Sequence, residues 1–185
     1  MDSRYYNAIE SNPVVAAVKD SEGLARCCES EDIQAVFILF GDICSIGEIV
    51  DRVKESGKLA LVHVDLVLGL SSKEIAVDYI KEHTRADGII TTKPLLIKRG
   101  KELSMCTVLR YFLIDSMAVE NIRYQQHTVK PDFIEVLPGL MPQIIKKICR
   151  LSRAPIIAGG LITDREAVLG ALSAGAIAVS TTNQD

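Results

Sequence analysis

Short apolar runs recur along the chain, and each is bounded by Gly, Pro, Asp or Lys. Eight of them are five to eight residues long and rich in β-branched residues, which is typical of buried strands. They cover residues 14–18, 35–40, 59–66, 88–92, 107–114, 133–137, 155–159 and 176–181. Their starts are 19 to 29 residues apart, so the pattern predicts one repeated structural unit.

Helix-like segments fill most of the gaps between these runs. They cover residues 46–57, 72–83, 95–104, 117–127, 141–152 and 163–175, and in the last one Thr163 and Glu166 have the spacing of a capping box. Strands that alternate with helices lie parallel, because a parallel connection needs a crossover of a dozen or more residues. Eight such units predict an α/β fold, a (β/α)8 TIM-type barrel, rather than an open doubly wound sheet.

The length of the chain limits this barrel. Barrels of this type usually need about 250 residues, whereas the chain has 185. We therefore expect a compact barrel in which residues 1–185 form a single domain and some helices are short. The sequence stops soon after the eighth run, so the last helix is missing or vestigial unless a partner subunit of a homo-oligomer covers that edge.

Composition narrows the classes of protein to consider. A net charge of −3 and a pI of 5.7 do not give the overall basic field of general nucleic-acid binders, so any RNA contact needs a local patch. The five cysteines include no CxxC pair, and no run approaches the roughly 20 apolar residues of a membrane span. We expect a cytoplasmic protein without membrane contact, metal or cofactor, and we interpret His63 as a core residue.

Polar residues collect where the predicted strands end, which is where TIM-type barrels bind ligands. Lys19 follows the first run, Asp65 closes the third and Lys93 the fourth, Asp115 follows the fifth, and Glu135 interrupts the sixth. Side chains alternate along a strand, so most of these residues converge on one cavity if their faces point inward. Two lysines and two carboxylates there would bind a small polar anion with hydroxyl groups. The alternative is a set of structural ion pairs.

The loops after the seventh and eighth runs have the composition of a phosphate site. Gly159 and Gly160 let backbone N–H groups approach phosphate oxygens, and the start of the following helix adds partial positive charge. Hydroxyl groups follow the eighth run, at Ser180, Thr181 and Thr182. In TIM-type barrels this pair of loops frequently binds phosphate. The glycines alone would also fit a tight turn.

Two basic runs are candidates for RNA contact. The first contains Lys98, Arg99 and Lys101, and the second contains Lys146, Lys147 and Arg150. Clustered cations attract the phosphates of nucleic acids. Both runs also fit ordinary solvated helix faces, which is the simpler interpretation.

Six long strings of the sequence are characteristic, namely KDSEGL, VFILFGDI, HVDLVLGLSSKEIAVDYIKEHTRADGIITTKPLLIKRGKEL, RYFLIDSMAVENI, PDFIEVLPGLMPQIIKKI and PIIAGGLITDREAVLGALSAGAIAVSTTNQD. Together they resemble the glycerol uptake operon antiterminator family. The resemblance extends over nearly the whole chain and implies a TIM-type barrel that senses glycerol 3-phosphate. It also implies that the liganded protein binds the leader mRNA of glycerol operons and lets transcription pass a terminator. The family's strand-end motifs and phosphate loops fall on the candidate residues named above.

Two other functions remain compatible with the strand-end residues. Phosphate-binding barrels include aldolases and isomerases, and Lys93 or Lys19 could act as a Schiff-base lysine with Glu135 or Asp115 as general acid or base. A sugar-phosphate sensor without RNA binding is the other alternative. The resemblance favours a regulator, so we expect no catalytic residues.

Overall fold

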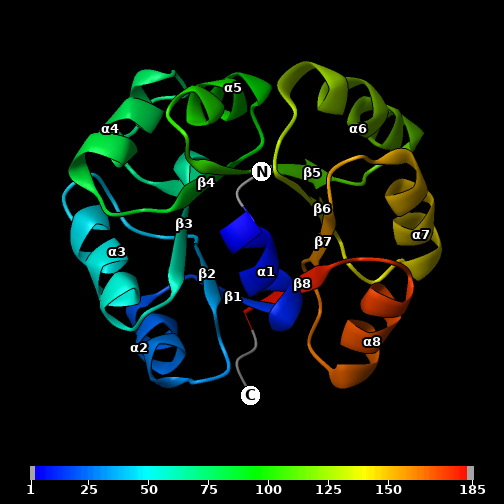
Figure 1. Cartoon of the computed structure of the whole chain (residues 1–185), viewed down its shortest axis with the longest axis horizontal. Coiled ribbons are helices and arrows are strands. Elements are labelled where there is room, and N and C mark those ends of the chain that lie inside the picture. The colour runs from blue at the N-terminus through cyan, green and yellow to red at the C-terminus, as the bar shows by residue number, and fades with distance from the viewer. Residues whose placement is uncertain (1–2, 183–185) are drawn as a thin grey trace.

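Eight parallel strands close into a barrel in the computed structural model, which describes residues 3–182 (Figure 1). The strands follow one another around the barrel in chain order, and β8 pairs with β1 to close it. They are β1 (Val14–Val18), β2 (Ala35–Ile38), β3 (Leu59–His63), β4 (Gly88–Thr91), β5 (Cys106–Phe112), β6 (Phe133–Leu137), β7 (Ile156–Gly159) and β8 (Ala178–Thr181). Each lies within or overlaps one of the eight predicted runs, so the predicted α/β TIM-type barrel is confirmed.

Seven helices of nine to 14 residues follow β1 to β7 and form a ring around the barrel (Figure 1). They are α2 (Ser21–Glu29), α3 (Ile46–Glu55), α4 (Ile75–His83), α5 (Pro94–Glu102), α6 (Ser116–Val129), α7 (Pro142–Leu151) and α8 (Arg165–Ser173). The expectation of short helices is thereby confirmed. The missing or vestigial last helix falls on residues beyond 182, which lie outside the described part of the chain. None of the helices in residues 3–182 has the length and apolarity needed to cross a bilayer.

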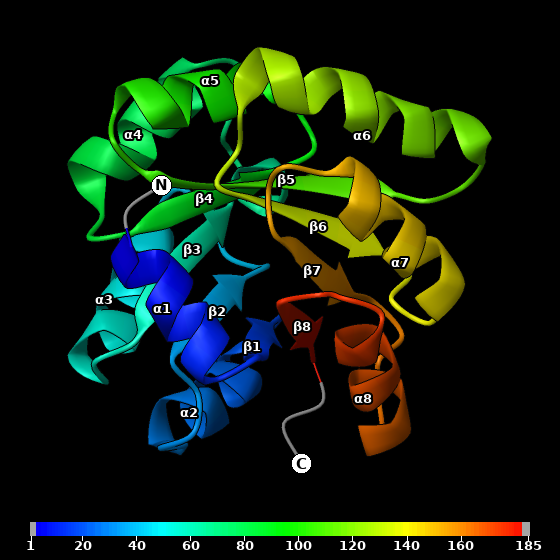
Figure 2. The same ribbon diagram turned by 45° about the vertical axis from the view of Figure 1, so that its right-hand side comes forward.

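An additional helix, α1 (Ser3–Ser11), lies in the middle of the ring and covers the N-terminal end of the barrel (Figures 1 and 2). Its Tyr5 and Ile9 are buried and pack with the side chains that fill the barrel interior, such as Phe37 and Phe133. Covering these apolar groups removes them from water, which stabilises the fold. Since α1 closes the N-terminal end, the carboxyl ends of the strands are left for binding.

Two details differ from the sequence prediction. β3 ends at His63, and Asp65 lies in a short 3-10 helix, η1 (Val64–Leu66), instead of closing the strand. The N-cap of α8 is Asp164 and not Thr163, because the carboxylate of Asp164 accepts a hydrogen bond from the backbone N–H of Ala167 at 2.9 Å. Aspartate is as effective an N-cap as serine or threonine, so the adjacent residue takes that position.

Apolar side chains also fill the space between the barrel and the helix ring. One cluster lies under α2 to α5, and a second lies under α6, α7 and α8. Close packing of this kind resists deformation. The strands therefore hold their carboxyl ends, and the polar residues there, in fixed positions.

Candidate functional site

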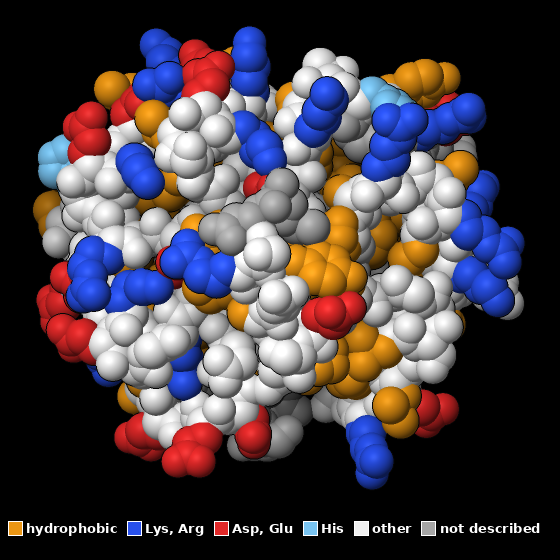
Figure 3. Space-filling view, viewed as in Figure 1, with side chains coloured by type: hydrophobic (Ala, Val, Ile, Leu, Met, Phe, Trp, Pro, Cys, Tyr) orange, Lys and Arg blue, Asp and Glu red, His pale blue; other side chains and the backbone are white. Residues whose placement is uncertain are grey.

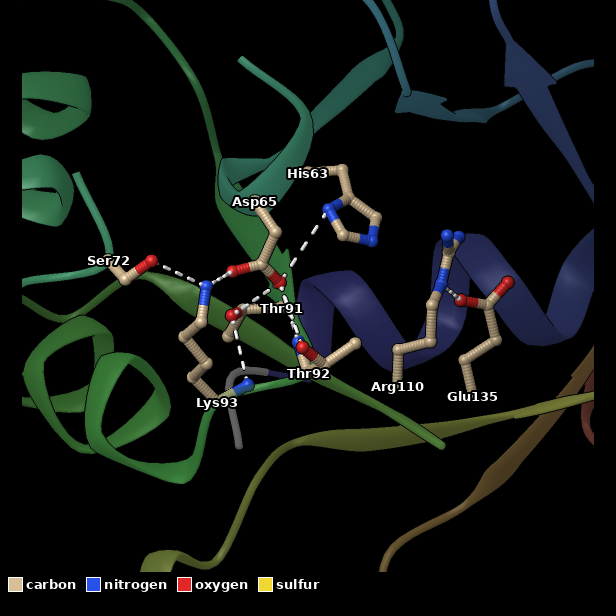
Figure 4. Close-up of polar contacts among 8 residues, drawn as sticks. All are labelled: His63, Asp65, Ser72, Thr91, Thr92, Lys93, Arg110 and Glu135. Atoms are coloured by element: carbon tan, nitrogen blue, oxygen red, sulfur yellow. Dashed lines mark hydrogen bonds and ion pairs between the residues drawn. The ribbon is translucent and has the colours of Figure 1, made fainter. Parts of the chain in front are cut away.

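Two ion pairs lie at the carboxyl end of the barrel, and the first joins Asp65 to Lys93 (Figure 4). Nζ of Lys93 lies 2.7 Å from Oδ1 of Asp65 and also donates to Oγ of Ser72 at 2.8 Å. The second carboxylate oxygen, Oδ2, accepts hydrogen bonds from Thr91 Oγ1 at 2.9 Å and from the backbone N–H of Thr92 at 2.8 Å. The residues that end β4 therefore hold Asp65 through both of its oxygens.

Burial and neighbouring groups together set the charge of Asp65 and of the nearby His63. Burial would raise the pKa of Asp65, but the hydrogen bonds from Lys93, Thr92 and Thr91 outweigh it and keep the pKa below its usual range. Burial and then the positive charge of Arg110 lower the pKa of His63 to about 4, so its imidazole is neutral near pH 7. His63 is 3% exposed, which confirms the interpretation of a core residue. Its Nδ1 has no hydrogen-bond partner within the described residues and lies 3.9 Å from Asp65 Oδ2.

The second ion pair joins Arg110 on β5 to Glu135 on β6, which are direct partners in the sheet register. Nε of Arg110 lies 2.5 Å from Oε2 of Glu135, and Ser180 Oγ on β8 donates to Oε1 at 2.5 Å. All three side chains are buried, and that of Glu135 is fully enclosed. Figure 4 shows His63 between this pair and the Asp65–Lys93 pair. Each oxygen of Glu135 therefore has a donor, as a buried carboxylate requires.

Gly159 explains how Glu135 reaches Ser180 although β7 lies between their strands. In the sheet register Gly159 is the partner of Ser180, and it lies beside the path of the Glu135 side chain. A Cβ at this position would lie 2.6 Å from Glu135 Oε1 and closer still to Ser180 Oγ. The absence of a side chain at Gly159 is therefore required by a buried hydrogen bond, independently of any ligand.

A cavity of about 320 Å³ opens next to this second pair, between the loops that follow β7 and β8. Its lining includes Arg110 and Glu135, the loop residues 160–163 and 180–182, and an apolar wall of Ala17, Leu39 and Leu137. Gly160 has a φ of +72°, which glycine adopts without strain, and this turns the chain into the loop. The cavity combines polar loops with an apolar wall, as small-molecule sites commonly do.

The structure brings together some of the predicted ligand residues and separates others. Glu135, Gly160, Ser180, Thr181 and Thr182 line the cavity of about 320 Å³. Asp65 and Lys93 form their own pair at the same end of the barrel, whereas Lys19 is exposed after β1 and forms no hydrogen bond or ion pair with the described residues.

Asp115 lies outside this group. It is the N-cap of α6 and accepts a hydrogen bond from the backbone N–H of Ala118 at 3.0 Å. Asp115 lines a different cavity, of about 520 Å³, between α6 and α7. In residues 3–182 no group of three or more His, Cys, Asp or Glu side chains is arranged to bind a metal ion.

Sequence reasoning missed several polar residues of the barrel mouth, and Arg110 is the most prominent. A visible signal was an arginine inside the apolar run TVLRYFLI, since a charged residue there must be paired or functional. Thr91, Thr92 and Ser72 gave no comparable signal. Their contacts with Asp65 and Lys93 depend on how β3, β4 and the loop after η1 meet in space.

The two basic runs differ in how their charges are used. In the first run, Arg99 is paired with Asp78 at 2.6 Å and with Glu102 at 2.9 Å, and these contacts raise its pKa. Lys101 is paired with Asp132 at 2.8 Å, while Lys98 is exposed. In the second run, on α7, three cations are exposed and form no hydrogen bond or ion pair with the described residues: Lys146, Lys147 and Arg150.

Charge is divided between opposite sides of the barrel. Residues 140–155 contain four Lys or Arg and no Asp or Glu, whereas residues 20–32 contain five Asp or Glu and one Arg. The first segment includes α7 and the second includes α2, and α2 and α3 lie across the barrel from α6 and α7 (Figure 1). Figure 3 shows Lys and Arg side chains gathered at the edge over α7 and acidic side chains near α2. The net charge of −3 therefore conceals a basic face.

Comparison with known proteins gives consistent matches over nearly the whole chain. Residues 14–185 match the family described as glycerol-3-phosphate responsive antiterminator. The chain is 42% identical over 175 residues to YgcP of Escherichia coli strain K12, described as uncharacterized, covering 95% of this chain and 91% of YgcP.

Two crystal structures are similar in both sequence and fold. A glycerol uptake operon antiterminator regulatory protein of Listeria monocytogenes has a TM-score of 0.88 and 32% identity, covering 92% of each chain. A glycerol uptake operon antiterminator-related protein of Thermotoga maritima has a TM-score of 0.82 and 32% identity, covering 92% of this chain and 95% of that one. Barrel enzymes that are 10% to 19% identical to the chain share its fold alone.

Proposed function

Because the chain belongs to the glycerol-3-phosphate responsive antiterminator family, we propose that it is a transcription antiterminator of glycerol uptake and utilisation genes. Glycerol 3-phosphate binds at the barrel mouth, and the liganded protein binds the leader mRNA of glycerol operons. This function places the protein in the bacterial cytoplasm. The observation that supports it best is the polar cavity of about 320 Å³ at the ends of β7 and β8, whose size suits a small phosphate ester.

In this proposal the phosphate of the effector lies against the loops after β7 and β8, at Gly160, Thr181 and Thr182, with Gly159 and Ser180 behind them. The hydroxyl groups of the effector then face Glu135 and the residues that end the neighbouring strands, namely Lys19, Asp65 and Lys93. Asp115 is left out, because its carboxylate caps α6 and lines a different cavity.

The basic face on α7 is the proposed RNA surface. Lys146, Lys147 and Arg150 are exposed and unpaired within the described residues, so contact with phosphate would not require an existing ion pair to break. Lys98 is a second candidate. Arg99 and Lys101 are weaker candidates, because each is already paired with a carboxylate.

Calorimetry tests the effector part of this proposal. We expect the protein to bind glycerol 3-phosphate and to bind glycerol far more weakly, because a charge-assisted hydrogen bond to phosphate is about twice as strong as a neutral one. Equal affinity for the two compounds would contradict a phosphate site.

A gel shift on a glycerol-operon leader RNA, with and without glycerol 3-phosphate, tests the regulatory part. Replacing the three unpaired cations of α7, Lys146, Lys147 and Arg150, by Gln should weaken RNA binding and reduce the slope of log K against log salt by about 2, at roughly 0.7 per phosphate contact on a single strand. The matched control replaces three cations before, on and after α4 by Gln, namely Lys73, Lys81 and Arg85. If neither the wild-type protein nor its glycerol-3-phosphate complex shifts the RNA, the protein is a sensor without RNA binding.

The contacts of Lys93 argue against this residue as the Schiff-base lysine of the enzyme alternative. Its Nζ donates hydrogen bonds to Asp65 and Ser72, which suits a charged ammonium group, whereas a Schiff-base lysine must be a neutral amine. Borohydride treatment with a small keto- or aldehydo-phosphate should therefore trap no adduct on Lys93. An adduct found by mass spectrometry would support the aldolase alternative instead.

A further inference from the structure

Arg110 is a buried cation with unused hydrogen-bond donors. Its side chain is 8% exposed, and the ion pair with Glu135 uses Nε. The two terminal nitrogens form no hydrogen bond with any residue in the range 3–182. A guanidinium carries five N–H donors, so four of them remain available. A buried charged group normally has all its donors satisfied, and this one lines a cavity instead.

The positive charge of the cavity must come from a side chain, because α8 contributes little. In phosphate-binding barrels the start of a nearby helix usually supplies N–H groups and partial positive charge. Here the carboxylate of Asp164 occupies the N-cap of α8, and Glu166 lies in its first turn. Both are negatively charged, so they oppose a second anion at this position.

We propose that Arg110 is the anion-binding residue of the barrel mouth and holds the phosphate group of the effector through the edge formed by its two terminal nitrogens. Glu135 and Ser180 act as positioning residues for Arg110. This inference rests on the proposed function, since it concerns the same cavity, and it names the residue that distinguishes a phosphate ester from a neutral polyol.

The contacts around Glu135 fix the direction of the guanidinium. Oε1 of Glu135 is held by Ser180, so Oε2 is fixed at the position where it accepts from Arg110 Nε. The pair joins adjacent strands at directly opposed positions of the sheet. Because Glu135 binds the guanidinium at Nε, the edge formed by the two terminal nitrogens is left for a ligand. This edge has two parallel N–H donors whose spacing matches two oxygens of a phosphate group.

The surroundings strengthen this interaction and select the ligand. Ala17, Leu39 and Leu137 form an apolar wall of the same cavity, and a lower dielectric strengthens a charge-assisted hydrogen bond. The cavity of about 320 Å³ limits the attached group to a few carbon atoms.

Calorimetry on the full chain tests Arg110 with glycerol 3-phosphate, inorganic phosphate and glycerol as probes. Arg110→Gln alone leaves Glu135 buried without its partner, which can unfold the protein. The decisive variant is therefore Arg110→Gln combined with Glu135→Gln, where the two amides can bond to each other. We expect this double variant to bind glycerol 3-phosphate at least about a hundredfold more weakly than the wild type. Arg110→Lys should lose about tenfold, because it keeps the charge and loses the paired donors.

Two further variants separate binding from positioning. Glu135→Gln alone should weaken binding by less than the double variant does, since the arginine remains. Arg85→Gln is the matched control, because it removes an arginine from the exposed Arg85–Asp51 ion pair at the other end of the barrel, and it should leave affinity unchanged. Circular dichroism and thermal unfolding establish that each variant is folded.

The outcomes separate this inference from the proposed function. If the wild type binds glycerol 3-phosphate and the folded double variant binds it within about threefold of that affinity, Arg110 does not contact the phosphate and the proposed function still stands. If the wild type binds neither glycerol 3-phosphate nor inorganic phosphate, both fail. A loss of affinity for the phosphate compounds, with glycerol affinity unchanged, supports Arg110 as the anion-binding residue.

Discussion

Adding one methyl group at Gly159 should destabilise the barrel, although φ is not positive there and the backbone belongs to an ordinary strand. The new Cβ would lie 2.6 Å from Glu135 Oε1 and closer to Ser180 Oγ, which is far inside van der Waals contact. If Ser180 rotates away, a buried carboxylate oxygen loses its donor, at about 1–3 kcal/mol. If the strands move instead, overpacking costs about 1–3 kcal/mol. We expect Gly159→Ala to lower the free energy of unfolding by roughly 1–3 kcal/mol, whichever of the two responses occurs.

Urea unfolding followed by circular dichroism measures this effect. The matched control is Gly170→Ala, because nothing lies within 4 Å of a Cβ there and the helix α8 should gain up to about 1 kcal/mol. Adding Ser180→Ala to Gly159→Ala removes one of the two clashing atoms. The double variant should therefore cost less than the sum of the single variants, by about 1 kcal/mol. A Gly159→Ala protein within about 0.5 kcal/mol of the wild type would refute the steric explanation of this glycine.

Three further predictions follow from the barrel mouth. Asp65→Asn should lower the free energy of unfolding near neutral pH, and this effect should disappear in acid. The pKa of Asp65 in the folded state is below its usual 3.8, so the carboxylate stabilises the fold above pH 3.8 and stops doing so as the pH falls through the folded-state pKa. Urea unfolding at several pH values measures this dependence. The free energy of unfolding of the wild type should fall as the pH is lowered from 6.5 to about 4, because His63 is protonated in the unfolded chain and not in the folded one over this range. His63→Phe should flatten this pH dependence. NMR titration of His63 and unfolding at several pH values would detect the two effects. Gly160→Val should abolish glycerol-3-phosphate binding in calorimetry while the fold persists; Gly57→Val is its control, since it has a similar φ of +80° and no atom within 4 Å.

The fold was predictable because it depends on local patterns that repeat. Eight apolar runs at similar intervals, separated by helical segments, leave few topologies for parallel strands. The helix α1 escaped prediction for a physical reason. It has only nine residues, and its Tyr5 and Ile9 are buried only because the barrel interior is there to contact them.

The mouth was predictable only in part, because its contacts join distant strands. Glu135 could be recognised from the sequence as a charged residue inside the sixth apolar run. Its pairing with Arg110, 25 residues earlier, and with Ser180, 45 residues later, depends on the sheet register. Gly159 illustrates the limit well: the sequence indicated a close approach of something to the backbone, and the nearest neighbours are side chains of the protein itself.

The net charge was the least informative of the sequence properties, and electrostatics explains why. Summing charges over the chain discards their positions, while at physiological salt a charge acts over a Debye length of only about 8 Å. α2 and α7 lie on different sides of the barrel (Figure 1), separated by helix and sheet layers that are each about 10 Å thick. A polyanion that approaches α7 therefore meets the unpaired Lys146, Lys147 and Arg150 and is screened from the acidic residues around α2. For such an encounter the local charge of the face decides the attraction, and that charge is positive even though the whole protein is acidic.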